Sequence, residues 1–335
     1  MTHSRYNLSN VNKAIQNPSL FLEEMERLSK PKNINKILNK ILFEKDYGDQ
    51  ANVMAEDWDN LIILDGFRYD YFEQYNTIDG ELSRITSQGS HSTEFLEKTF
   101  VGRQFHDTVY ITANPHAPRL VDDDVFYLME SVYDADRETA AREHYPEQVI
   151  EMALPVIEGY PNKRHIIHMM QPNVPFLGPT AEKIRERLYS EEGVTFVNME
   201  PSDVPESFSP REELGTIKEA CEKGYISEVS LREAYRENVK IALEYAQQLL
   251  DEIEGKTAIT ADHGEMLGER VPPLYYKQYS HERHIYTDEL RHVPWLVIDS
   301  DERREIYSED PLQDSQLADD TVKDRLEKLG YLDYV

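Results

Sequence analysis

Hydrophobic residues occur along this chain either in short continuous runs or at helical spacing, and the two patterns alternate. Short runs closed by a polar or glycine-containing turn are typical of buried strands, and they occur at residues 60–64, 107–112, 164–170, 257–261 and 293–298. Apolar stripes at helical spacing predict helices at residues 67–75, 146–158, 227–253 and 312–330. This alternation predicts an α/β fold in which a largely parallel central sheet carries helices on both faces.

The first 50 residues predict a helical arm outside the sheet. Asn17-Pro18 has the signature of a helix start, and Phe21, Met25 and Leu28 follow at helical spacing. A second helix is predicted by the apolar positions Ile34, Ile37, Leu38, Ile41 and Leu42. We expect this arm to pack on the main domain, and a separate pair of partner-binding helices is the alternative.

Residues 51–335 predict one α/β domain, because no change in composition divides them. Within this domain, residues 180–226 are charged and irregular with helical pieces, and they predict an insertion over one face. The sequence contains no internal repeat and no low-complexity tract. The Rossmann fingerprint and the P-loop are both absent from the sequence, which argues against nucleotide binding by either device.

The charge of the chain restricts its partners. Its 64 acidic and 36 basic residues give a net charge of −28 and a pI near 4.7. A surface this negative argues against nucleic acid and anionic membranes as partners. Because 39% of the residues are hydrophobic, we expect a globular body under the charge, with a composition that resembles halophilic proteins of a salt-rich cytoplasm.

Cys221 is the only cysteine, which excludes an intramolecular disulfide and a cysteine-based zinc cluster. It lies in a stretch of helical pattern, and we expect it to be a small buried apolar residue. The first residues contain no apolar signal region, and no apolar run approaches the ~18 residues of a membrane span. These features predict a cytoplasmic protein without a membrane span and leave the oligomeric state open.

Polar residues that could bind a metal ion follow two of the predicted strands. Asp262 and His263 follow residues 257–261, and Asp65 follows residues 60–64. Ligands bind at the carboxyl ends of strands in α/β sheets, and a carboxylate with an imidazole suits Mn²⁺ or Zn²⁺ better than Mg²⁺ or Ca²⁺. The alternatives are that Asp262 caps a turn beside a surface histidine and that Asp65 caps the following helix.

A hydroxyl-rich turn around Gly89 leads into a further predicted helix. Its serine and threonine side chains could simply cap that helix. They could equally present a nucleophile at the helix N-terminus, where the helix dipole stabilises an oxyanion and favours a phosphate or sulfate group.

Together these elements resemble the alkaline phosphatase superfamily, in particular its sulfatase-like branch. Residues 60–70 resemble the first strand of that branch, in which an aspartate ends an apolar run and Arg-x-Asp follows. Residues 260–269 resemble its second metal motif, which is the most specific match. Residues 168–176 are similar to the loop with a histidine and a Pro-His-x-Pro turn, and residues 290–297 to the strand after the metal motif. The likeness covers roughly residues 60–298.

The resemblance implies a nucleophile on the turn after the first strand, at a helix N-terminus, that also ligates the metal. The sulfatase motif C/S-x-P-S-R, whose first residue becomes formylglycine, is absent because this turn lacks the proline and the arginine. The turn is more similar to phosphotransferase members such as lipoteichoic acid synthase, in which a hydroxyl precedes an acidic-aromatic pair by four residues. That register points to Ser90, four residues before Glu94, with Ser92 and Thr93 as the other choices.

The same resemblance implies a single divalent metal ion (Mn, Mg, Ca or Zn) held by Asp65, Ser90, Asp262 and His263. His168 or His281 would protonate the leaving group, and a surface or core role is the alternative for each. The implied substrate-binding residues are Arg68, His91, Ser92 and Asn173. Asn173 stands where the family has the histidine of its Pro-His-x-Pro turn, and it can donate a hydrogen bond but cannot shuttle a proton.

The sequence therefore predicts a metal-dependent hydrolase or transferase that acts on phosphate or sulfate esters through a serine nucleophile. We expect its substrate to be a small-molecule ester or a sugar- or lipid-linked ester. A sulfatase is the alternative within this class of enzyme. A catalytically inactive binding or scaffold protein that keeps the fold is the alternative outside it.

Overall fold

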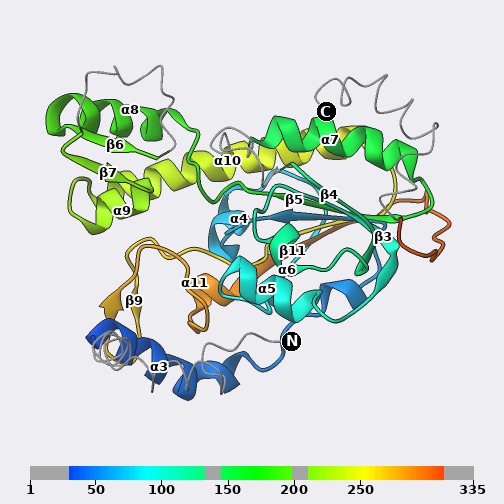
Figure 1. Ribbon diagram of the computed structural model, residues 1–335, viewed down its shortest axis with the longest axis horizontal. Coiled ribbons are helices and arrows are strands. Elements are labelled where there is room, and N and C mark those ends of the chain that lie inside the picture. The colour runs from blue at the N-terminus through cyan, green and yellow to red at the C-terminus, as the bar shows by residue number, and fades with distance from the viewer. Residues whose placement is uncertain (1–29, 133–144, 198–209, 313–335) are drawn as a thin grey trace, which may run out of the picture.

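The computed structural model describes residues 30–132, 145–197 and 210–312 of the chain. At its centre, seven strands form one sheet in the order β2-β11-β8-β1-β5-β3-β4 (Figure 1). Strand β11 runs antiparallel to β8 and β2, and the other neighbouring pairs are parallel, so the predicted largely parallel sheet is confirmed. The strands of this sheet are β1 (Asn60–Leu64), β2 (Glu81–Thr86), β3 (Phe105–Thr112), β4 (Phe126–Ser131), β5 (Arg164–Met169), β8 (Thr257–Thr260) and β11 (His292–Ile298).

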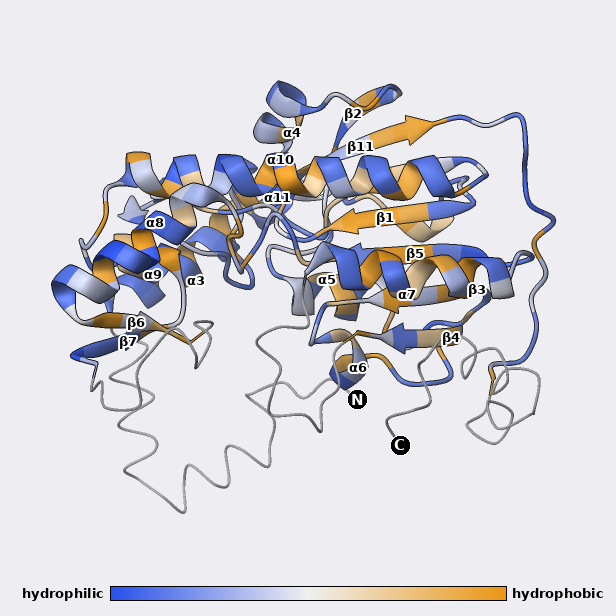
Figure 2. Ribbon diagram, turned by 90° about the horizontal axis from the view of Figure 1, so that it is seen from above, coloured by the Kyte–Doolittle hydropathy of each residue, from blue (hydrophilic) through white to orange (hydrophobic). Residues whose placement is uncertain are grey.

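Strand β1 lies in the middle of the sheet and is buried along its whole length. Ile62 and Leu64 belong to the larger hydrophobic core on one face, whereas Leu61 and Ile63 belong to the smaller core on the other face. Successive side chains of a strand point to opposite faces, so a continuous apolar run requires that both faces are covered. Figure 2 shows β1 in the hydrophobic colour.

Helices cover both faces of the sheet, as the alternating pattern predicts (Figure 1). One face carries α4 (Tyr69–Tyr75), α7 (Pro146–Gly159) and α10 (Glu228–Glu252), and the other carries α5 (Ser92–Thr99) and α6 (Ala117–Leu120). The apolar side of α10 packs on the larger core through residues such as Leu231, Val239 and Leu249. Within the described ranges, the helices are all too short or too polar to span a bilayer.

The segment predicted as an insertion contains more regular structure than its charged sequence indicates. It is built from α8 (Pro179–Arg187), the π-helical turn Leu188–Glu192, β6 (Val194–Phe196), β7 (Glu212–Leu214) and α9 (Ile217–Glu222). Strands β6 and β7 pair in parallel, and α8 and α9 both pack on α10 (Figure 1). Cys221 is buried on α9, as the sequence predicts.

Helix α3 (Pro31–Phe43) packs on the body with its polar face. Its only buried residues are Asn35 and Asn39, whose side-chain amides donate hydrogen bonds of 2.9 Å to Val271 O and 3.1 Å to Tyr286 O. The isoleucine stripe that the sequence predicts as the packing face points outward instead, and Ile41 is 69% exposed. The first helix of the arm and nearly all of the predicted helix 312–330 lie outside the described residues.

The remaining short elements join these parts. They are the 3₁₀ turns Glu44–Tyr47 and Val53–Ala55, the hairpin strands β9 (Arg270–Val271) and β10 (Tyr276–Lys277), and helix α11 (Asp288–Arg291).

Candidate active site

Three neighbouring strands bring polar side chains to one edge of the sheet. Asp65 follows β1, Asp262 and His263 follow β8, and His168 lies near the carboxyl end of β5. All four side chains are fully buried. Because β8, β1 and β5 are adjacent and parallel, their carboxyl ends meet at the same place, the usual location of a ligand site in an α/β sheet.

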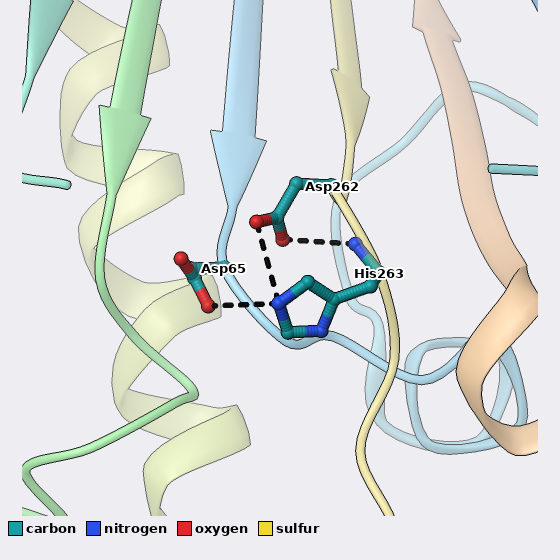
Figure 3. Close-up of side chains that lie close together, drawn as sticks. All are labelled: Asp65, Asp262 and His263. Carbon is teal, nitrogen blue, oxygen red and sulfur yellow. Dashed lines mark hydrogen bonds and ion pairs between the residues drawn. The ribbon is translucent and has the colours of Figure 1, made fainter. Parts of the chain in front are cut away.

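Asp65, Asp262 and His263 form a group that could hold a metal ion, since one ligand atom from each lies within 4.8 Å of the others. His263 Nε2 lies 3.7 Å from Asp65 Oδ1 and 3.4 Å from Asp262 Oδ2, and Figure 3 shows an oxygen of each carboxylate directed at this nitrogen. We call these three residues the triad.

Hydrogen bonds fix the orientation of each member of the triad. Asn114 and Asn173 each donate a side-chain hydrogen bond of 2.8 Å to a different oxygen of Asp65. The Nδ1 of His263 lies 2.7 Å from the carbonyl oxygen of Gly264. With Nδ1 as the donor in that bond, Nε2 carries the lone pair that a metal ion requires.

The turn after β8 depends on a glycine. A Cβ atom at Gly264 would lie only 2.0 Å from the carbonyl oxygen of Glu289, and the Gly264 N–H donates a hydrogen bond of 2.9 Å to Leu290 O. This close backbone approach leaves no room for a side chain and holds the residues after Asp262 in place.

Two buried polar atoms at the triad have no hydrogen-bond partner in the described structure. They are Asp262 Oδ2 and His168 Nε2. The other nitrogen of His168, Nδ1, lies 2.8 Å from the hydroxyl of Tyr110, which can fix the ring in one tautomer. Buried polar atoms are rarely left unsatisfied, so an unpaired carboxylate oxygen and imidazole nitrogen at the same point fit a bound metal ion.

The buried charged groups of the triad lie so close together that they shift one another's pKa. Burial alone would raise the pKa of Asp65, but the imidazoles of His168, whose Nε2 lies 3.7 Å from Asp65 Oδ2, and of His263 hold this pKa well below its ordinary value. Burial and the Asp65 carboxylate raise the pKa of Asp262. Burial would lower the pKa of His263, and the two carboxylates outweigh it and raise that pKa. A divalent cation would relieve the repulsion between the carboxylates.

The hydroxyl that meets the triad belongs to Ser92. Its Oγ lies 3.1 Å from Asp65 Oδ2, to which it donates, and 3.2 Å from His263 Nε2. Ser92 is the first residue of α5, and the side chain of His91 caps that helix by accepting a hydrogen bond from the Thr93 N–H.

Ser90, which the family register indicates as the nucleophile and a metal ligand, is buried away from these contacts. Its Oγ lies 3.0 Å from Glu94 Oε2 and 2.8 Å from the carbonyl oxygen of Glu282. The physical reason is the tight turn at Gly89, where a Cβ atom would lie 2.6 Å from the Phe95 backbone nitrogen. The turn directs Ser90 toward Glu94, and the helix starts two residues later.

His281 lies beside the triad in a pair with Glu265. Its Nδ1 is 3.1 Å from Glu265 Oε2, and its ring centroid is 4.2 Å from that of His263 and 5.1 Å from that of His91. Burial lowers the pKa of His281, and the Glu265 carboxylate opposes this shift. His281 is therefore oriented by a buried carboxylate, an arrangement suited to proton transfer.

His91 completes a group of imidazoles at the site. Burial and the neighbouring charges of His281 and His263 lower the pKa of His91 to about 2, and its ring centroid lies 5.6 Å from that of His116. At neutral pH this ring is uncharged, so it can donate or accept a hydrogen bond without adding positive charge.

Arg68 and Asn173, which the sequence predicts to bind substrate, both have protein partners. Arg68 forms a two-pronged ion pair with Asp70 at 2.9 and 2.7 Å and a third contact of 2.6 Å with Glu269. Asn173 contacts Asp65 directly. Asn173 therefore orients a member of the triad, whereas Arg68 is held by two carboxylates beside the backbone carbonyl of Glu265.

Several residues of the site are not indicated by the sequence reasoning. Glu265 is the fourth residue of the Asp-His-Gly-Glu motif. Asn114 and His116 lie in the turn after the strand that ends at Thr112. The position of each of these three residues shortly after a predicted strand could have indicated a role in the site. No comparable signal marks Tyr110 or Lys218. Lys218 lies on α9, far from the motifs in sequence, yet its ammonium contacts both Asn173 and Glu265.

The fold and site thus define an α/β protein with a buried candidate metal centre and a helix-terminal serine. No family model matches the sequence, and no curated protein matches it. Among solved structures, the chain is similar to the C-terminal periplasmic domain of EcEptC from Escherichia coli in complex with Zn. That similarity has a TM-score of 0.43 and 12% identity, over 72% of this chain and 72% of the other.

Two further solved structures are similar to the chain. Phosphonate monoester hydrolase of Agrobacterium radiobacter gives a TM-score of 0.42 and 14% identity, over 72% of this chain and 67% of that chain. A protein in the alkaline phosphatase superfamily from Vibrio parahaemolyticus gives a TM-score of 0.38 and 12% identity, over 81% of this chain and 65% of that chain.

Proposed function

We propose that this protein is a metal-dependent hydrolase or transferase of phosphate or sulfate esters, with Ser92 as the nucleophile. The observation that carries the proposal is the position of the Ser92 hydroxyl, 3.1 Å from Asp65 and 3.2 Å from His263 at the first residue of α5. A hydroxyl that touches a candidate metal centre at a helix N-terminus suits attack on an anionic ester.

The residues that would hold the metal ion are Asp65, Asp262, His263 and His168. The unpaired Nε2 of His168, directed at the two carboxylates, supports a ligand role for this residue over the leaving-group role that the sequence suggests. A bound divalent ion would lower the pKa of the serine hydroxyl and offset the negative charge of the ester oxygens.

In the first half of the reaction, Ser92 Oγ forms a bond to phosphorus or sulfur as the bond to the ester oxygen breaks. The Ser92 proton passes to solvent, and protonated His281 donates its proton to the leaving oxygen. In the second half, water or an acceptor alcohol attacks the covalent intermediate and gives its proton to His281. The bond to Ser92 Oγ then breaks, and the serine regains a proton from solvent.

The test is hydrolysis of p-nitrophenyl phosphate, its bis-ester and p-nitrophenyl sulfate, with and without Mn²⁺, at high salt. We expect metal-dependent turnover that falls at least about 10³-fold in Ser92→Ala and in Asp262→Asn. Ser90→Ala is the matched control, because it removes the same hydroxyl two residues away and should keep turnover. Loss in Ser90→Ala with retention in Ser92→Ala would reverse the assignment of the nucleophile.

A further inference from the structure

Lys218 is a buried cation within the site, although it belongs to the segment of residues 180–226. Its side chain is only 4% exposed, on helix α9. It donates a hydrogen bond of 3.0 Å to Asn173 Oδ1 and a second, short one to Glu265 Oε2. A lysine is rarely buried unless its charge is paired, and here the pairing partner is a fully buried carboxylate.

Each partner of Lys218 contacts a different functional group of the site. Asn173 donates its amide N–H to Asp65 Oδ1 at 2.8 Å, so the lysine, by occupying Asn173 Oδ1, fixes which end of the amide faces the triad. Glu265 Oε2 accepts both from Lys218 and from His281 Nδ1 at 3.1 Å. One ammonium group therefore connects the triad to the Glu265–His281 pair.

Lys218 also supplies the opposite charge that a buried carboxylate requires, because the side chain of Glu265 is fully buried. A charged carboxylate is what holds the Nδ1–H of His281 and leaves its Nε2 for proton transfer. Without the lysine, Glu265 would be a buried charge held only by the His281 imidazole and the Met266 N–H, which is strongly unfavourable.

We propose that Lys218 is a positioning residue for proton transfer to the leaving group, supplied to the site by the 180–226 segment. It acts through Glu265 on His281 and through Asn173 on Asp65. This inference rests on the proposed function for its kinetic consequence, whereas its structural consequence for His281 is independent of any substrate.

The kinetic test compares two esters that differ in their need for an acid. p-Nitrophenolate leaves without protonation, whereas phenolate from the matching phenyl ester requires it. For Lys218→Met, we expect kcat to fall about 100-fold for the phenyl ester and only a few fold for the p-nitrophenyl ester. Lys218→Arg, which keeps a cation, should restore much of the loss. An equal loss on both esters would show a general structural role and overturn the proposal.

Lys223→Met is the matched control, because it removes the same charge next to the C-terminal end of α9, where the lysine is 40% exposed and pairs with Glu212. The second readout is the ¹⁵N NMR signal of the His281 imidazole in the protein without added metal or substrate. We expect this signal to shift in Lys218→Met and to stay unchanged in Lys223→Met. If the His281 signal is unchanged in Lys218→Met, the positioning role is overturned, whether or not any ester is cleaved. If the signal shifts but the wild-type protein cleaves no ester, only the proposed function is rejected.

Discussion

Asp262 Oδ2 and His168 Nε2 lie 4.0 Å apart, both fully buried and both without a hydrogen-bond partner in the described structure. They come from two strands that each pair with β1, on its opposite sides. An unsatisfied buried polar group costs about 1–3 kcal/mol, so two of them facing each other need a compensating ligand. A cation between them would bind both atoms and would also reduce the repulsion between the two carboxylates of the triad.

We therefore predict that one equivalent of Mn²⁺ or Zn²⁺ binds the wild-type protein and raises its stability. At a metal concentration 100 times Kd, the gain in unfolding free energy is about 2.7 kcal/mol. Calorimetric titration and thermal unfolding with and without EDTA measure both effects. Asp262→Asn should abolish the gain, whereas Asp288→Asn, which changes a side chain that is 70% exposed, should keep it. Wild type that binds no metal would contradict the prediction.

Ser90→Ala should lower stability without affecting the metal centre. Its hydroxyl accepts a hydrogen bond of 3.2 Å from the Ile285 N–H and lies 3.0 Å from the buried Glu94 carboxylate. Losing these contacts should cost about 1–3 kcal/mol in urea unfolding. Ser83→Ala, at an exposed hydroxyl on β2, is the control and should change stability by less than about 0.5 kcal/mol. A loss of metal stoichiometry in Ser90→Ala would mean that Ser90 is a ligand after all.

The central strands could be predicted from the sequence because they are short buried runs of mainly apolar and β-branched residues, as in β1 and β8. Strand β2 could not, because it is an edge strand with the mixed sequence Glu81–Thr86 and pairs only with β11. Its register depends on a partner more than 200 residues later in the chain, a contact that no local pattern encodes.

Local patterns mislead where tertiary contacts decide which face of an element is buried. Helix α3 has an isoleucine stripe that includes Ile37 and Ile41, yet Asn35 and Asn39 are its buried residues, because their amides bond to backbone groups of the body. The triad was predictable, since its aspartates and histidine directly follow buried strands. Lys218 was not, because it reaches the site from a different helix.

Gly264→Ala tests how strictly the turn after β8 is constrained. The new Cβ would lie 2.0 Å from the Glu289 carbonyl oxygen, so the backbone must move, at a cost of about 1–3 kcal/mol or more. We expect a lower midpoint in thermal unfolding and weaker metal binding, since His263 precedes this glycine. Gly159→Ala at the end of α7, where a Cβ meets nothing within 4 Å, is the control and should be neutral or slightly stabilising. Equal effects of the two substitutions would contradict this account.

The buried His165 should make the free energy of unfolding depend on pH in the acid range. Burial and the charge of Arg304 lower the pKa of His165 from 6.5 to about 3 in the folded protein. Between these two values the unfolded chain binds a proton that the folded protein does not, so stability falls as the pH decreases below about 6.5. From pH 7 to pH 5.5 this amounts to about 1 kcal/mol. Urea unfolding of His165→Gln should lack that part of the loss, and a slope equal to that of wild type would refute the assignment.

Tyr110→Phe separates the positioning of a ligand from the packing around it. The phenol oxygen lies 2.8 Å from His168 Nδ1, and the ring belongs to the smaller core. With the tyrosine hydroxyl as the acceptor from Nδ1–H, Nε2 is free for a metal ion, and phenylalanine keeps the ring but removes that acceptor. We expect metal affinity to fall about 10–100-fold in calorimetric titration, with the fold retained. Tyr286→Phe removes a hydroxyl that bonds to Glu44 at 3.0 Å, and it should leave metal affinity unchanged. If both variants bind metal as wild type does, His168 is not a ligand, and its unpaired nitrogen needs another explanation.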